Sequence, residues 1–267
     1  RDVAPSRGLG DVYKRQSYNL RYGDFKARIS GYYTRIYDQS KVISYYDDVA
    51  ATFTNFAMSG IDKVHFGLEA AVSIPIYHTL ALNGAVSWGQ YTYDSNPYYL
   101  QTQDNSGDIV SDGYVYWKDF RVESTPQTAV NVGLSWRSNN NIYLSADFNY
   151  YNNMYLSMSP IYRTDAVITG GMAPGDIEHL RRQEKFDSAY TLNASIGKNW
   201  YIHRKYTLGF SLDVKNILNN QDIKTGGYEQ TRLSKNTETT VTTYQAFDSK
   251  YFYMFGTTYY LNLYFRF

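Results

Sequence analysis

The residues that could do chemistry in this 267-residue chain are few and scattered. Asp176, Glu178 and His179 lie close together, as metal ligands or an acid–base pair would, but the neighbouring RRQEK segment favours a charged loop surface. No nucleophile elbow or phosphate-binding loop occurs in the sequence. The four histidines do not have the spacing of metal ligands: His65, His78, His179 and His203. We therefore expect no enzyme, no cofactor and no metal.

A second kind of candidate is a set of aromatic and charged residues in long polar segments, where stacked rings could grip a glycan or a siderophore. The alternative is that these residues have only a structural role and fix the turns of their own segments. The chain has 30 tyrosines, so aromatic rings are abundant throughout it. The candidates for ligand contact are Tyr98, Tyr99, Tyr114, Tyr116 and Trp117 in one segment and Tyr228, Glu229 and Arg232, from GGYEQTR, in another.

Composition excludes several classes of function. The 26 basic and 25 acidic residues leave a net charge of +1, so no basic field exists to gather nucleic acid. The absence of cysteine removes disulfides, zinc–thiolate sites and thiol catalysis. The mean hydropathy is -0.50, and no run approaches the roughly twenty apolar residues of a spanning helix. Averaging over a window would, however, cancel the signal of strands that alternate between lipid and water.

Alternation is the strongest pattern in the chain. About eight segments place apolar residues on one face of an extended strand and small, polar or charged residues on the other. The last is the longest, at about seventeen residues, where ordinary strands have five or six. The expected strands are 22–37, 63–75, 80–89, 128–136, 142–150, 188–197, 206–215 and 251–267. Charges fall on the polar face, at Lys26, Arg28, Glu69, Asp147, Asp213 and Lys215.

The connections come in two sizes that alternate strictly. Short turns are expected at 75–78, 138–141 and 203–205, and long polar loops at 38–62, 94–125, 156–187 and 218–250. Short turns on one rim and long loops on the other are typical of an outer-membrane β-barrel, with the short turns periplasmic and the long loops extracellular. Bulky rings near strand ends match its aromatic girdles: Trp88, Trp136, Trp200 and Tyr206.

The first sixteen residues, RDVAPSRGLGDVYKRQ, show neither alternation nor an apolar run. We interpret residues 1–16 as a non-native or disordered leader and residues 17–267 as the C-terminal part of a barrel domain.

Several segments resemble a known family. GTTYYLNLYFRF at the end resembles the closing strand of TonB-dependent outer-membrane receptors, and FSLDVKNILNNQDI resembles their penultimate strand. Three segments resemble successive barrel strands of the same family: HFGLEAAVSIPIY, STPQTAVNVGLSW and QEKFDSAYTLNASIGKNWYI. With KTGGYEQTR, the likeness is closest to the Bacteroidetes type, the SusC-like relatives with a carboxypeptidase-regulatory-like domain. The resemblance implies that this chain supplies about eight C-terminal strands of a 22-stranded barrel. It also implies that Phe267 and Phe265 belong to the signal read by the barrel-assembly machinery.

The function that the resemblance implies is import of a scarce nutrient, such as a glycan, siderophore or haem, across the bacterial outer membrane. The implied partners are outer-membrane lipid, TonB acting through an N-terminal part that this chain lacks, a surface lipoprotein of the SusD type, and a small-molecule or oligosaccharide ligand. Two alternatives stay open: a complete eight-stranded barrel with an adhesive or structural role, and an outer-membrane enzyme, for which no nucleophile and base are evident.

Overall fold

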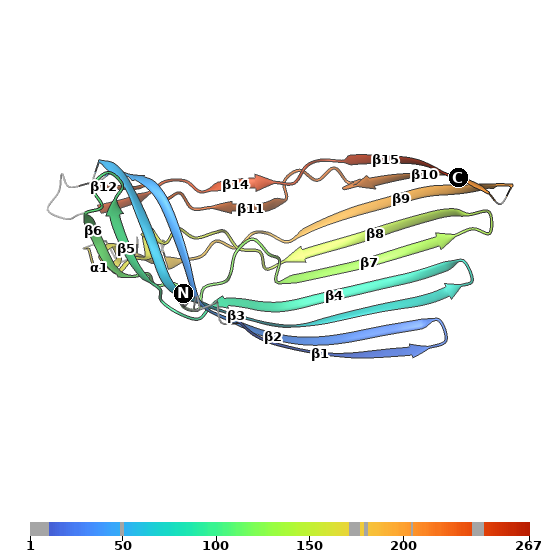
Figure 1. Ribbon diagram of the computed structural model, residues 1–267, viewed down its shortest axis with the longest axis horizontal. Helices are drawn as coiled ribbons and strands as arrows, with labels where there is room; N and C mark the ends of the chain where they lie inside the picture. Colours follow the sequence, from blue (N-terminus) through green and yellow to red (C-terminus); the bar gives the residue numbers. More distant parts are fainter. Residues whose placement is uncertain (1–10, 49–50, 171–176, 179–180, 204, 237–242) are drawn as a thin grey trace, which may run out of the picture.

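The computed structural model describes residues 11–48, 51–170, 177–178, 181–203, 205–236 and 243–267. They form an antiparallel, almost entirely β structure built on one large curved sheet (Figure 1). Nine strands follow one another across this main sheet: β1 (Asp11–Tyr22), β2 (Phe25–Asp47), β3 (Thr52–Tyr77), β4 (Leu80–Tyr93), β7 (Thr128–Arg137), β8 (Ile142–Asn152), β9 (Ala189–Ile202), β10 (Tyr206–Lys215) and β15 (Thr258–Arg266). The all-β, antiparallel prediction is confirmed.

Short turns gather at one end of the main sheet, on the right in Figure 1. They join β1 to β2, β3 to β4, β7 to β8 and β9 to β10. Three of them hold a residue with positive φ, a conformation that glycine and asparagine adopt at low cost: Gly23, Asn141 and His203. The expected turns at 138–141 and 203–205 are confirmed, whereas β3 runs on to Tyr77 and moves the expected turn at 75–78 to residues 78–79.

The opposite end carries three long segments with structure of their own, which we call the rim segments (Figure 1). The first contains the hairpin β5 (Tyr98–Gln103) and β6 (Ile109–Tyr114). The second contains the 3-10 turn η1 (Ile161–Arg163) and the short helix α1 (Asp165–Thr169). The third contains β11 (Lys224–Tyr228), β12 (Leu233–Asn236), β13 (Thr243–Ala246) and β14 (Lys250–Tyr253). Short and long connections are therefore sorted between the two ends, with one exception, the short turn that joins β2 to β3 at this end.

The expected fourth loop, residues 38–62, is wrong. β2 and β3 continue through it as paired strands and turn only at residues 48–51. The pairing shifts twice, between Ile36 and Lys41, and Asp38 and Gly60 both have positive φ. Each of the two strands has one bulge here, and one bulge reverses the alternation of the strand that contains it. The reversal hides these strands from a search for uninterrupted period-2 patterns.

One face of the main sheet is apolar from strand to strand, because the register places apolar residues side by side. One row across six strands reads Leu80, Trp136, Leu144, Ile196, Leu212 and Leu261. These side chains are exposed or half-buried, as in Leu144 at 42% and Leu261 at 60%. We call this side the outward face. Nothing in the described part of the chain packs over it.

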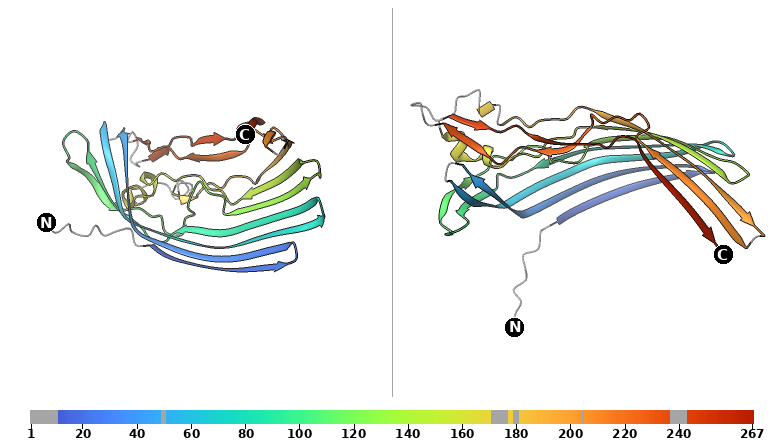
Figure 2. Two further views of the ribbon diagram at one scale, coloured as in Figure 1. Left: turned by 45° about the vertical axis from the view of Figure 1, so that its right-hand side comes forward. Right: turned by 90° about the horizontal axis from the view of Figure 1, so that it is seen from above.

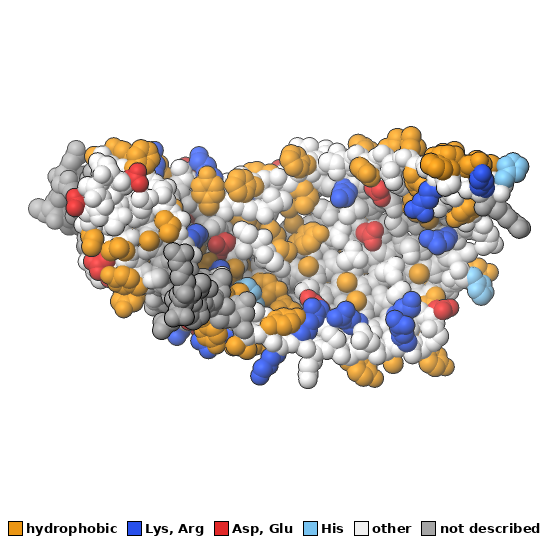
Figure 3. Space-filling view, viewed as in Figure 1, with side chains coloured by type: hydrophobic (Ala, Val, Ile, Leu, Met, Phe, Trp, Pro, Cys, Tyr) orange, Lys and Arg blue, Asp and Glu red, His pale blue; other side chains and the backbone are white. Residues whose placement is uncertain are grey.

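The other, inward face is polar and concave. The right-hand view of Figure 2 looks at the molecule of Figure 1 from above. In it, the strands at the β15 edge curve away from the middle strands toward the side that faces the reader in Figure 1. Lys, Arg, Asp and Glu side chains spread over the middle of this face (Figure 3). It holds all six charges expected there, since Lys26, Arg28, Glu69, Asp147, Asp213 and Lys215 share it by register.

Tyrosine rings lie over glycines of the neighbouring strand on the inward face. Tyr143 is paired with Gly197 and Tyr264 with Gly209, and each ring occupies the space where a glycine Cβ would be. Tyr32 covers Gly67 in the same way. Such pairs fill the gap that a glycine leaves in a sheet and help to fix register.

The sheet is open in this structure. Among the described residues β1 pairs only with β2, and β15 only with β10, so a closed eight-stranded barrel is not found. Residues 11–16 of the expected leader pair along β2 in this structure despite their poor alternation; residues 1–10 lie outside the described part of the chain.

The expected final strand, 251–267, is broken into two. β14 pairs with β11 in the third rim segment, and β15 then joins the main sheet. The Asn216 side chain holds the break, since its amide donates to the carbonyls of Asn220 and Phe255, and its backbone carbonyl accepts from Thr257. The buried Asn216 thereby ties the end of β10 to the start of β15.

Candidate functional site

The hydrophobic cores of the molecule lie among the rim segments. The main core joins residues of the extended ends of β2 and β3, of β4, of the β5–β6 segment and of the η1–α1 segment. Its buried members are Tyr45, Phe56, Met58, Ile61, Tyr93, Tyr99, Val115, Trp117, Met158, Ile161, Tyr162 and Val167. A smaller core, with Met154, Leu156 and Phe186, packs against Tyr251 of β14. We call these packed segments the rim assembly.

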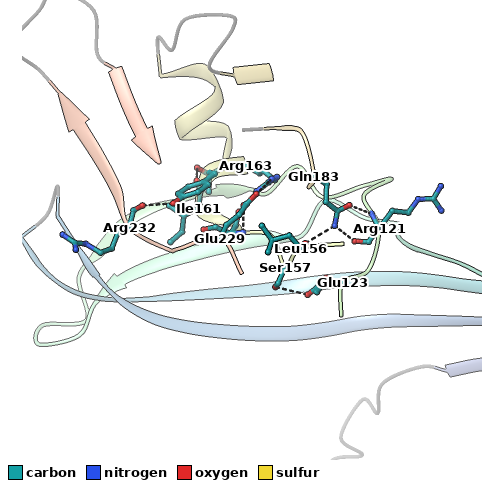
Figure 4. A network of polar contacts seen from close by, with 12 residues as sticks. Arg121, Glu123, Leu156, Ser157, Ile161, Arg163, Gln183, Glu229 and Arg232 are labelled. Atoms are coloured by element: carbon teal, nitrogen blue, oxygen red, sulfur yellow. Dashed lines mark hydrogen bonds and ion pairs between the residues drawn. The ribbon is translucent and has the colours of Figure 1, made fainter. Parts of the chain in front are cut away.

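A buried ion pair joins the second rim segment to the third. The two guanidinium nitrogens of Arg163 donate to the two carboxylate oxygens of Glu229, at 2.5 and 2.8 Å (Figure 4). The Arg163 side chain is fully buried and that of Glu229 is 13% exposed. Glu229 also accepts the backbone N–H of Ser159, and Arg163 donates to the Ser159 carbonyl. A bidentate pair with further hydrogen bonds on both partners fixes both position and orientation.

Further hydrogen bonds connect the remaining segments (Figure 4). The hydroxyl of Tyr162 donates to the carbonyl of Arg232, whose guanidinium pairs with Asp48 beyond the end of β2 at 2.9 and 3.0 Å. The Gln183 amide accepts from the backbone N–H of Arg121 and donates to its carbonyl. The rim segments thus form one connected body and not independent loops.

Burial and neighbouring charges shift several pKa values in the rim assembly. Burial raises the pKa of Tyr162 to about 12. Burial also raises the pKa of Tyr45 and of Tyr93, and the Glu123 carboxylate that accepts from the Tyr93 hydroxyl adds to the second shift. The hydrogen bond from Arg232 lowers the pKa of Asp48. The buried hydroxyls therefore stay neutral at any ordinary pH.

The five aromatic candidates of the first rim segment divide into two groups. Tyr99 and Trp117 are each 1% exposed and belong to the core, where Tyr99 stacks on Phe56 at 4.6 Å. Tyr98 and Tyr114 are exposed and meet edge to face across β5 and β6 at 5.7 Å. Tyr116 is exposed, and its backbone N–H donates to the Arg163 carbonyl. Only the second group presents ring surface to solvent.

The candidates of the third segment also have separate places. The Tyr228 ring is exposed, Glu229 is held by Arg163, and the Arg232 side chain is half-exposed in its pair with Asp48. The two terminal candidates lie at the opposite end of the sheet, beside the short turns. Phe265 stacks on Tyr206 at 5.8 Å, and Phe267 is 93% exposed.

The inward face is a second place where a ligand could bind. Shallow hollows there are lined by Arg28, Glu69, Ser87, Asn131 and Asn149 over β2 to β8, and by Asp147, Asn193, Ser195 and Asp213 over β8 to β15. Amide, hydroxyl and carboxylate groups of this kind hydrogen-bond hydroxylated or charged molecules.

Sequence reasoning missed Arg163, Gln183 and Asn216. Arg163 lies 66 residues from its partner, so no local pattern marks it. Asn216 carried a signal, because an asparagine directly after a strand often takes the positive φ that it has here.

No group of three or more His, Asp or Glu that could hold a metal is found among the described residues, and Asp176 and His179 lie outside them. The helices of the described ranges include none long and apolar enough to cross a membrane.

The chain matches no protein-family model and no curated protein at a significant level. The family named from its sequence motifs therefore stays a prediction.

Proposed function

We propose that this chain is the C-terminal barrel portion of a TonB-dependent receptor that imports a nutrient across the bacterial outer membrane. Its outward face contacts lipid, its inward face lines part of the barrel interior, and the rim assembly meets ligand outside the cell. TonB acts through parts beyond this chain, the barrel-assembly machinery reads the Phe265 and Phe267 end, and a SusD-type lipoprotein assists in ligand capture. The chain itself has no enzymatic role.

The observation that carries the proposal is the outward face. Nine adjacent strands present it, and it holds exposed leucine, valine, isoleucine and aromatic side chains in register. Apolar patches of this extent are rare on soluble monomers and mark surfaces that meet a partner or a membrane. The sorted connections favour the membrane, since soluble sandwiches have no reason to place four short turns at one end and three long segments at the other.

Neighbouring residues of β4 give a direct test. Val86 lies on the outward face, whereas Ala85 faces inward into a shallow hollow, and both are exposed. A lysine at the lipid-facing midplane of a barrel costs about 2–4 kcal/mol, whereas one facing the interior costs little. We therefore expect Val86→Lys, but not Ala85→Lys, to reduce the amount of full-length gene product folded in the outer membrane. Equal tolerance of both substitutions would contradict the proposal.

The reading frame upstream of this sequence decides between the receptor and a self-contained small barrel. A plug-like domain and many further alternating segments are expected. A start codon and a signal peptide directly upstream of this sequence would exclude the receptor.

A further inference from the structure

The alternation of residues between the two faces reverses in both β2 and β3 at one level of the sheet. Toward the short turns, Ile29 and Tyr33 of β2 lie on the outward face. Beyond the bulges at Asp38 and Gly60, the odd-numbered Tyr45 instead lies in the rim core, and the even-numbered Val42 is exposed. β4 has no bulge and identifies the sides, because Tyr93 continues its inward row and lies in the same core. The rim core is therefore on the inward side.

The reversal changes which side of the strands is apolar. On the turn side of the bulges, apolar residues point outward and polar residues inward. On the rim side, Phe56 and Met58 of β3 point inward into the core. The outward side is mixed there: Asn55 accepts from Ser44 and donates to Asp104, and Val42 and Phe53 are exposed beside them. A strand pair in water buries its apolar side against a core, whereas one in hydrocarbon turns that side out. A reversal of this kind is expected where a strand pair passes from hydrocarbon into water.

The length of the apolar outward stretch agrees with this interpretation. On β3 it runs from Val64 to Ile74. Ten residue steps of about 3.4 Å give about 34 Å along the strand. At a tilt of about 45° they cross about 24 Å, close to the roughly 25 Å apolar band of outer-membrane barrels.

Outward charges lie only at the limits of this stretch. Across the described strands of the main sheet, Lys14 and Arg35 are outward near the bulges, and Lys198 is outward near the short turns. Lys198 lies over the Trp200 ring at 5.2 Å. Long basic side chains at such positions reach the headgroup region while their stems cover apolar surface.

We propose that the bulge pair at Asp38 and Gly60 marks the outer boundary of the hydrocarbon. The outward face contacts acyl chains from Val64 to the short turns, and the outward side of β2, β3, β5 and β6 beyond the bulges stands in water. This inference rests on the proposed function, because it assigns the level at which the membrane ends.

Two matched pairs of positions test the boundary. Leu68 and Phe53 lie on the outward side of β3 and are 57% and 60% exposed, and Ile29 and Val42 are the equivalent pair on β2. Exposure in the structure does not separate the members of either pair. These 267 residues contain no cysteine, so each single cysteine variant carries one thiol in this part of the gene product. The experiment is labelling by a membrane-impermeant maleimide on intact cells that display the full-length gene product, with denatured protein as the reference for complete labelling.

We expect labelling of Phe53→Cys and Val42→Cys, and loss of labelling at Leu68→Cys and Ile29→Cys, because maleimide reacts with a thiolate that forms only in water. Protection of all four thiols would overturn the boundary and leave the membrane proposal standing. Labelling of all four would overturn both, since no hydrocarbon would then cover the outward face.

Discussion

Removing the charge of Glu229 should open the rim assembly while leaving the main sheet intact. In Glu229→Gln the Arg163 guanidinium keeps the Ser159 carbonyl as a partner but loses the carboxylate that neutralises it. Its side chain is fully buried, and its Nε has no hydrogen-bond partner among the described residues. Breaking a buried pair in this way costs about 3–5 kcal/mol.

Hydrogen exchange measures this cost locally. A loss of about 3–5 kcal/mol in opening free energy speeds amide exchange by roughly two to four orders of magnitude. We expect that increase in residues 159–167, and not in β7 to β10. Measurement by mass spectrometry on the folded protein in detergent would resolve the two regions.

The matched control is Arg232→Gln, which breaks an ion pair of the same assembly whose side chains are 51% and 28% exposed. Exposed pairs contribute about 0–1 kcal/mol, so exchange should rise by less than about fivefold. Replacing both buried partners, in Arg163→Met with Glu229→Leu, should recover part of the protection, because it removes the stranded charge. If Glu229→Gln exchanges like Arg232→Gln, the ion pair does not hold the assembly together.

Two further predictions concern alkaline pH and sheet register. The pKa of Tyr162 is about 12, whereas an unfolded tyrosine loses its proton near pH 10. The contribution of the neutral Tyr162 hydroxyl to the free energy of unfolding is therefore fully present below about pH 10, and about 3 kcal/mol of it is lost as the pH rises through about 12. Tyr162→Phe should weaken this fall, measured by near-ultraviolet circular dichroism during thermal unfolding from pH 9 to 12, and an unchanged fall would show that Tyr162 does not contribute. Gly67→Ala should destabilise the sheet by about 1–3 kcal/mol in urea unfolding, since the new Cβ meets the backbone carbonyl of Trp88 as well as the Tyr32 ring. Gly31→Ala is its control, with only an ordinary contact at 3.5 Å to Leu68, and equal effects of the two substitutions would contradict this reasoning.

Uninterrupted alternation made most of the main sheet predictable. The strands β4 and β7 to β10 were placed within a few residues because the alternation of each runs on without a bulge. The same pattern failed for the far parts of β2 and β3, where the bulges at Asp38 and Gly60 reverse the faces. The final strand was predicted too long because its alternation continues through the break that Asn216 imposes.

The candidate site was less predictable because its contacts are distant in sequence. Aromatic residues of one segment lie partly in the core and partly on the surface: Trp117 is buried and its neighbour Tyr116 is exposed. Which ring faces the core depends on the packing of η1 and α1 against it, and no local pattern encodes that packing. Glu229 was identified as a candidate, but its partner Arg163 lies in another rim segment.

The central claim is that hydrocarbon covers the outward face of the sheet and water covers the inward face. Spin labels along β10 measure this most directly. Single cysteine variants at the outward Leu208, Phe210 and Leu212 and at the inward Thr207, Ser211 and Asp213 would carry the label in the full-length protein in lipid vesicles. The account predicts that accessibility to oxygen and to a water-soluble nickel chelate alternates with a period of two, with oxygen favoured at the outward positions. Outward labels that contact protein, with neither lipid nor oxygen around them, would contradict it.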